Sequence, residues 1–196
     1  MSNYRPISLL PALSKVAEKV PTSQIYHYCE LNKLFPKRQF GFRKAKSTNQ
    51  AIADLIYEIE KLKQKRNSGF ALITIDFSKA FDLIDHEILY KKMSLLGFKA
   101  NAIELIKSYL TDREQYVEIN GKMSNSIKLG KQGSSQGSCI SPLLYLIYTI
   151  DLEELLKEHF HIMFADDTAV LLEIKNKANG TKEIQQLMQR YINISP

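Results

Sequence analysis

The chain has 196 residues, of which 44% are hydrophobic and 24% are charged, and its formal net charge is +6. Those values are ordinary for a soluble globular chain of one or two domains. Because no apolar run approaches the ~18 residues of a membrane span, no secretory signal opens the chain and only two cysteines occur, we expect an intracellular protein of the nucleus or cytoplasm, neither secreted nor held by disulfides.

The first part of the chain predicts an extended entry, a helix and a loop. Residues 3–11 predict extended chain, and helical spacing covers 13–31, where Pro21 should kink or break the helix because it lacks an N–H donor. Residues 32–47 predict a loop, and a clear amphipathic helix begins at Thr48. The apolar face of that helix is formed by Ala51, Ile52, Leu55, Ile56, Ile59 and Leu62.

The next part predicts a strand and two helices. The apolar run 70–75 is typical of a buried strand, and it stops at Asp76. Asp85 is placed to cap a helix that ends at Gly97. A second helix is expected over 101–110.

A hairpin and a longer helix follow. The Asn-Gly pair at 120–121 predicts the tight turn of a hairpin spanning about 116–130. The Ser-Pro pair at 141–142 predicts a helix start, with Ser at the cap, and the helix should run to about residue 157.

The end of the chain predicts a second hairpin. Short apolar strands over 161–165 and 168–173 flank the pair Asp166-Asp167, and a last helix is expected over 181–192. With no internal repeat, the whole pattern predicts an α+β fold, in which helices cover a small, largely antiparallel sheet.

Three carboxylates stand at the ends of apolar strands. Asp76 ends the first strand, and Asp166 and Asp167 lie at the bend of the last hairpin. Aspartates at turns are common for structural reasons alone, so an ordinary turn remains an alternative. Two adjacent carboxylates on an apolar hairpin repel each other, and a divalent cation would remove that repulsion. Oxygen ligands favour Mg²⁺ or Mn²⁺, and such a set suits two-metal phosphoryl transfer.

Cations gather in two stretches. In 33–46 they alternate with phenylalanines, a mixture that favours nucleic-acid binding over solubility alone. In 61–66 they are more typical of a solvated helix face. His159 and His161 have no further ligand at zinc spacing, so no zinc site is expected.

Five blocks, in the correct order, resemble the reverse transcriptase domain of non-LTR (LINE-type, Jockey-like) retrotransposons. They are Asn3–Leu10, Gln39–Lys44 with Ser47-Thr48, Ile75–Asp82 with Asp85-His86, Gln136–Ser138 with Ser141–Leu144, and Phe164–Thr168. The resemblance implies a right-hand polymerase fold with partial fingers over 1–69 and a palm over 70–196. It also implies a fingers-side insertion around 114–132 and no thumb.

The same resemblance implies an RNA-directed DNA polymerase that uses two Mg²⁺ ions, with Mn²⁺ as a substitute. Its partners would be an RNA template, a DNA primer and deoxynucleoside triphosphates. Asp76, Asp166 and Asp167 would be the catalytic, metal-binding carboxylates, and the backbone carbonyl of Phe77 would contact the second metal.

Further roles follow from matching positions. For the nucleotide, Arg5 would grip the triphosphate, Gln136 and Gly137 would border the pocket, and Phe81 would stack under the deoxyribose and exclude a 2′-hydroxyl. Two alternatives stay open: Phe81 as ordinary core, and Arg5 as a surface ion-pair partner. The residues placed along the template would be Arg43, Lys44 and Lys46.

Two features depart from the family's pattern or extent. The family usually has proline before the Gln-Gly pair, whereas this chain has Ser134-Ser135, which puts the rigidity of the pocket loop in doubt. The chain also begins inside the first block and ends soon after the last, so we expect it alone to be weakly active or inactive. A non-catalytic nucleic-acid-binding remnant and a related polymerase such as an intron maturase are the rival interpretations.

Overall fold

The computed structural model describes residues 8–65, 69–77, 79–174 and 180–192. The chain divides into two compact units, each built from two stretches. The helical unit comprises Met1–Phe35 and Ser78–Ile150, and the sheet unit comprises Pro36–Phe77 and Asp151–Pro196. The expected division into partial fingers over 1–69 and a palm over 70–196 stays a prediction.

The sheet unit contains a three-stranded antiparallel sheet. Its strands are β1 (Gly69–Asp76), β6 (Phe160–Phe164) and β7 (Asp167–Ile174), in the order β1-β7-β6. The three predicted strands are therefore confirmed, with each end shifted by one residue. In the register of β1 with β7, Asp76 pairs with Asp167.

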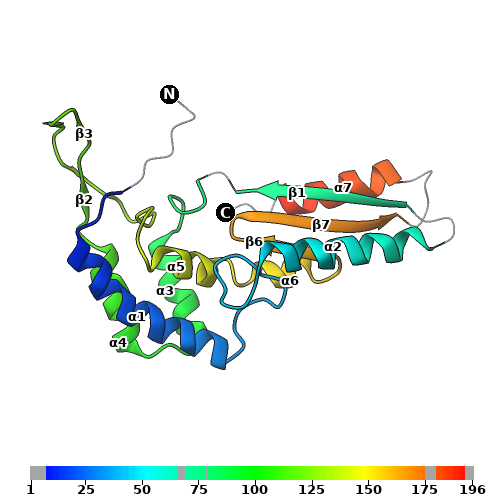
Figure 1. The fold of residues 1–196 in the computed structure, drawn as a ribbon, viewed down its shortest axis with the longest axis horizontal. Coiled ribbons are helices and arrows are strands. Elements are labelled where there is room, and N and C mark those ends of the chain that lie inside the picture. Colours follow the sequence, from blue (N-terminus) through cyan, green and yellow to red (C-terminus); the bar gives the residue numbers. More distant parts are fainter. Residues whose placement is uncertain (1–7, 66–68, 78, 175–179, 193–196) are drawn as a thin grey trace. The chain divides into compact units, whose positions relative to one another are not determined.

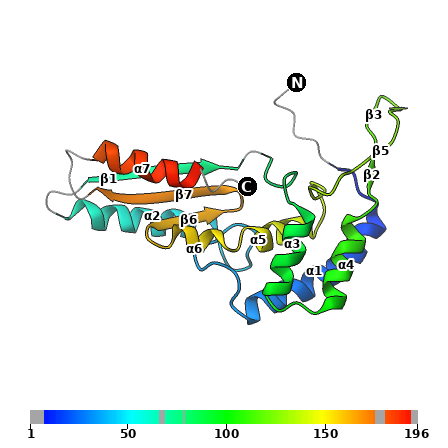
Figure 2. The same cartoon turned by 180° about the vertical axis from the view of Figure 1, so that it is seen from behind.

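Helices cover both faces of this sheet, as Figures 1 and 2 show from opposite sides. On one face α2 (Thr48–Lys63) contributes Ala51 to a core cluster with Phe40 and Ile162. On the other face lie α6 (Leu152–Leu156) and α7 (Gly180–Ile192). The core cluster of that second face contains Leu156, Val170 and Leu172.

The strand β1 is less buried than its apolar sequence predicts. Its residues alternate between partial burial and exposure, and Leu72 is 43% exposed. The prediction of a buried strand is wrong because β1 lies at an edge of the sheet: among the residues the structure describes, Ala71, Ile73 and Ile75 pack on a core cluster, and the residues between them are exposed.

A capping box starts α2 where the sequence predicts. The Gln50 N–H donates to Ser47 Oγ at 3.2 Å, and the Ser47 N–H donates to Gln50 Oε1 at 3.0 Å. This arrangement satisfies two N–H groups that would otherwise lack partners at a helix start. Of the six predicted apolar positions, Ile52 and Ile56 are exposed.

The helical unit contains α1 (Ala12–Leu31), α3 (His86–Leu95), α4 (Ala100–Leu110) and α5 (Ser141–Tyr148). Helix α3 packs against both α4 and α5. As predicted, Asp85 caps α3, since its Oδ1 accepts from the Ile88 N–H at 3.0 Å. Fully buried side chains of this unit include Leu89, Met93, Ile106, Leu144 and Ile147.

Helix α1 runs through Pro21, so of the predicted kink or break the break does not occur. Tertiary contacts hold both halves: Glu18 is buried before the proline, and Ile25 and Cys29 are buried after it. The Thr22 hydroxyl also donates to the Glu18 carbonyl at 2.7 Å.

The hairpin of the helical unit has the predicted turn. Asn120 and Gly121 have φ of 50° and 74° between β3 (Glu118–Ile119) and β4 (Lys122–Met123). Two positive φ values are what a type I′ turn requires. Next to this pair, β2 (Glu114–Gln115) pairs with β5 (Ile127–Lys128).

The helix predicted over 141–157 is two helices, α5 and α6, which belong to different compact units. Ser141 is the first residue of α5 rather than its cap, and its hydroxyl donates to the Ser135 carbonyl at 2.9 Å. Among the described helices, none is both long and apolar enough to cross a membrane.

Candidate active site

Two of the three predicted catalytic aspartates face each other across neighbouring strands. Asp76 is the last residue of β1, and Asp167, the first residue of β7, is its direct partner. Directly opposite residues of an antiparallel pair point to the same face, with Cβ atoms about 4.5–5.5 Å apart. Asp166 lies in the two-residue turn between β6 and β7, directly before Asp167. Asp76 and Asp167 are exposed, and Asp166 is half-buried.

The donor set at this end of the sheet fits a hard divalent cation. All three side chains are carboxylates, the ligands that Mg²⁺ and Mn²⁺ prefer. Within the described residues, however, no three Asp, Glu, His or Cys side chains stand together as a ready-made metal site. The strand register brings the backbones of Asp76 and Asp167 together. Phe77, whose carbonyl is the predicted fourth contact, follows β1 directly and is half-buried.

The predicted nucleotide loop lies in the helical unit. Gly137 is exposed and has φ of +104°, a conformation that residues with a Cβ rarely adopt. The Gln136 carbonyl accepts from the Ser8 N–H at 2.9 Å, and the Gln136 carboxamide donates to Asp82 Oδ1 at 3.4 Å. In the same loop, the Ser134 N–H donates to the Phe81 carbonyl at 2.9 Å. The loop that contains the Gln-Gly pair is therefore hydrogen-bonded to both Phe81 and Asp82.

The missing proline is offset by hydroxyl contacts. Ser134 and Ser141 share a short hydrogen bond between their hydroxyls, and the Ser141 hydroxyl also bonds to the Ser135 carbonyl. The Ser138 N–H donates to the same carbonyl at 3.1 Å. These hydrogen bonds hold Ser134 and Ser135, the two serines that precede the Gln-Gly pair.

A buried glutamate that the sequence analysis missed anchors this loop. Glu18 of α1 is 4% exposed, and its Oε2 accepts from the Ser138 hydroxyl at 2.8 Å and from the Cys139 N–H at 2.7 Å. Its Oε1 accepts from the Ser14 hydroxyl at 3.1 Å and the Tyr109 hydroxyl at 3.4 Å. The sequence does contain one indication of this role. Residues 18, 25 and 29 share a helix face by their spacing, and an acidic residue on an otherwise apolar face suggests a buried hydrogen-bond acceptor.

Phe81 is neither fully buried nor free. Its ring lies 5.2 Å from the ring of Tyr145, centroid to centroid, at an angle of 38°. The side chain is half-buried. A cavity of about 290 Å³ in the same unit is lined in part by Asp82, Arg113 and Gln136, so it borders the Gln-Gly pair.

The predicted template cations belong to the sheet unit, and two of them brace their own loop. Arg43 donates from Nη1 to the Pro36 carbonyl at 2.8 Å. Lys46 donates to the Lys37 carbonyl at 3.2 Å, and its ammonium lies 4.6 Å from the centre of the Phe40 ring. Lys44 is exposed. Arg5, the predicted triphosphate contact, lies outside the described residues.

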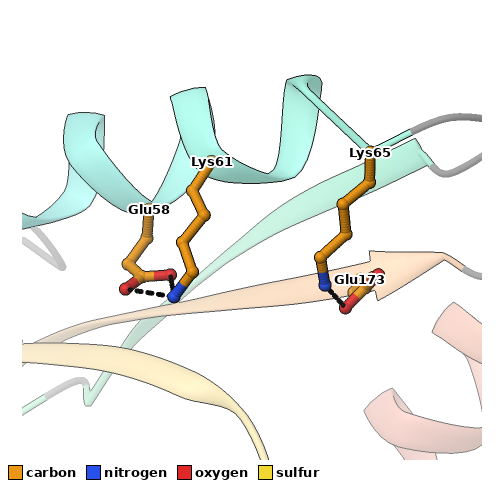
Figure 3. Close-up of polar contacts among 4 residues, drawn as sticks. All are labelled: Glu58, Lys61, Lys65 and Glu173. Atoms are coloured by element: carbon orange, nitrogen blue, oxygen red, sulfur yellow. Dashed lines mark hydrogen bonds and ion pairs between the residues drawn. The ribbon is translucent and has the colours of Figure 1, made fainter.

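The second basic stretch forms ion pairs with carboxylates. Figure 3 shows Lys61 reaching Glu58 at 3.3 Å and Lys65 reaching Glu173 of β7 at 2.7 Å. Lys63 pairs in the same way with a glutamate of α2 at 2.7 Å. Exposed pairs of this kind contribute little to stability. They agree with the simpler interpretation of this stretch as a solvated helix face.

The family and the two relatives described next are all RNA-directed DNA polymerases. The family described as reverse transcriptase (RNA-dependent DNA polymerase) matches residues 1–194. The RNA-directed DNA polymerase from the mobile element jockey of Drosophila melanogaster is 32% identical over 200 residues, covering 97% of this chain and 21% of that protein. The probable RNA-directed DNA polymerase from the X-element transposon of the same species is 30% identical over 194 residues, with the same coverage. The chain spans about a fifth of the length of these curated relatives.

Solved structures share the fold. Telomerase from Candida albicans, in complex with a TWJ fragment of telomeric RNA, aligns with a TM-score of 0.60 at 12% identity, covering 90% of this chain and 32% of that one. Apo telomerase from Candida tropicalis, truncated from its C-terminal domain, aligns with a TM-score of 0.56 at 17% identity, covering 90% and 37%. At such low identity the likeness is one of fold alone.

Proposed function

Because the chain belongs to the reverse transcriptase (RNA-dependent DNA polymerase) family, we propose that it carries the centre that adds deoxynucleotides to a primer 3′-hydroxyl along an RNA template. The observation that carries the proposal is the pairing of Asp76 with Asp167, with Asp166 in the adjoining turn. This places the three carboxylates of the family's motifs at one end of one sheet.

Asp76, Asp166 and Asp167 would hold the metal, together with the carbonyl of Phe77. When bound, two Mg²⁺ ions would supply positive charge to the attacking and leaving oxygens of an in-line displacement. The chain's own contribution is position, because rates of such reactions fall steeply when the reacting atoms are displaced.

By the family resemblance, the nucleotide would be bound by Arg5, Phe81, Gln136 and Gly137. The exposed Gly137 leaves its backbone open to approach, and Gln136 is oriented by its contact with Asp82. Phe81 packs on Tyr145, a contact that would support its ring under the deoxyribose. Arg5 would add a guanidinium for the triphosphate, a group suited to bidentate contact with phosphate.

The loop cations would lie along the template. Lys44 is exposed, and it lies between Arg43 and Lys46, whose charged ends donate to carbonyls of the same loop. Their binding energy would come from phosphate contacts, which fix register and carry no sequence information.

The metal site is tested directly by Mn²⁺ titration of the 196-residue chain, with free Mn²⁺ followed by electron paramagnetic resonance. We expect saturable binding that Asp166→Asn weakens at least tenfold. Asp54→Asn removes an exposed carboxylate from α2 and is the matched control, which should bind as the wild type does. Equal binding by the wild type and Asp166→Asn would refute the assignment. In an active polymerase that contains this domain, the same Asp166 variant should lose primer extension and keep template binding.

A further inference from the structure

The loop that precedes α2 continues the sheet beside β6. The Phe40 N–H donates to the Met163 carbonyl at 2.8 Å, and the Met163 N–H donates to the Arg38 carbonyl at 2.9 Å. Gln39, between these two bonds, forms a parallel bridge with Met163. Within the loop, Gln39 is 1% exposed although its side chain is polar.

The buried carboxamide of Gln39 reaches the turn between β6 and β7. Its Oε1 accepts from the Ala165 N–H at 3.1 Å and from the Gly41 N–H at 2.8 Å. Ala165 is the first residue of that turn and has φ of +58°. Such a conformation is uncommon for a residue with a Cβ, and it persists where surrounding contacts hold it.

Gly41 lets the loop approach the turn closely. A Cβ built on Gly41 would lie 2.1 Å from the Ala165 nitrogen and 2.8 Å from the Phe164 carbonyl carbon. Backbone atoms cannot move aside as a side chain can, so only glycine fits there. Phe40, between Gln39 and Gly41, anchors the loop in the core cluster against which Phe164 packs.

From these contacts we propose that Gln39 is a positioning residue for the metal-binding hairpin. It acts through the Ala165 backbone, holding the turn so that Asp167 stands opposite Asp76 with Asp166 beside it. The proposal rests on the proposed function and extends it, because it assigns to the second motif block a role in shaping the centre as well as a place along the template. Removing a residue that orients metal ligands without touching the metal typically weakens metal affinity by about 10–100-fold.

The test uses the 196-residue chain and two variants. Gln39→Met keeps the length of the side chain and removes the oxygen acceptor. Phe40→Leu is the matched control, since it loosens the same loop in the core and leaves the acceptor in place. Two quantities are measured: Mn²⁺ affinity by electron paramagnetic resonance, and exchange of the Ala165 amide proton by NMR.

We expect Gln39→Met to weaken Mn²⁺ binding about tenfold or more and to speed exchange at Ala165. Phe40→Leu should change Mn²⁺ affinity less than about twofold, at a temperature where circular dichroism shows both variants folded. Wild-type Mn²⁺ affinity or unchanged Ala165 exchange in Gln39→Met would overturn the proposal. Should that variant not fold, the wild type decides, because an unprotected Ala165 amide proton would equally overturn it.

A failure of the proposed function would give a different result from a failure of the Gln39 proposal. If the wild type binds no Mn²⁺ in a way that depends on Asp166, the metal centre is wrong and its positioning falls with it. The exchange of Ala165 would then still establish whether Gln39 holds the turn.

Discussion

Substitutions of Glu18 should show whether its hydrogen-bond acceptors or its charge contribute more to the free energy of unfolding. In Glu18→Ala, the Ser138 hydroxyl and the Cys139 N–H lose their acceptor inside the helical unit. Each buried donor left unsatisfied costs about 1–3 kcal/mol, so we expect a loss of about 3 kcal/mol in the free energy of unfolding. For a chain of this size that corresponds to a fall of about 6–12 °C in the midpoint of thermal unfolding.

Glu18→Gln should be much milder. The amide oxygen can take the place of Oε2, which accepts from the Cys139 N–H. The amide nitrogen then faces the hydroxyls of Ser14 and Tyr109, and a hydroxyl can rotate to accept as well as donate. We expect a loss of about 1 kcal/mol or less, or about 2–4 °C.

Thermal unfolding followed by far-UV circular dichroism compares the two variants with the wild type. Gln186→Ala, at an exposed position of α7, is a control for substitution as such and should change little. Two results would refute the reasoning. An unchanged midpoint in Glu18→Ala means the buried hydrogen bonds contribute nothing, and equal losses in both variants mean that the charge, and not the acceptor, is what matters.

Three further predictions concern single side chains. In an active polymerase containing this domain, Phe81→Val should raise ribonucleotide use relative to deoxynucleotide use, and an unchanged ratio would leave Phe81 only its packing on Tyr145. Binding of single-stranded RNA should weaken with salt on a log–log plot, and Lys44→Ala should reduce that slope by about 0.7, whereas a flat wild-type line would remove the case for phosphate contacts. Burial raises the pKa of Cys29 to about 12, so at pH 8 only about one thiol in ten thousand is ionised; an alkylating reagent should label Cys139 first, and rapid labelling of native Cys29 would contradict this.

The local elements of this protein are determined by short-range patterns. The start of α2 at Thr48, the Asp85 cap and the Asn-Gly turn each form where the sequence predicts, because every partner lies within a few residues. The order of the five motif blocks also suffices for the family, which the match over residues 1–194 confirms.

Short-range patterns fail to predict the structure where packing between distant residues determines it. Proline has a low helix propensity, yet contacts on both sides carry α1 through Pro21. An apolar run cannot distinguish a central strand from an edge strand, and β1 is an edge strand. The Ser-Pro start and apolar composition of residues 141–157 do not reveal that the helix divides between two compact units.

The sequence alone names Asp76, Asp166 and Asp167 as candidates, and only the tertiary structure decides how they are held. Asp76 meets Asp167 through strand register, which depends on burying the apolar face of β1. The contact of Gln39 with Ala165 joins residues 126 positions apart, and that of Glu18 with Ser138 joins residues 120 apart. No local periodicity encodes such pairs, because each is formed by a polar side chain that satisfies hydrogen-bond donors, backbone or hydroxyl, brought near it only when the chain folds.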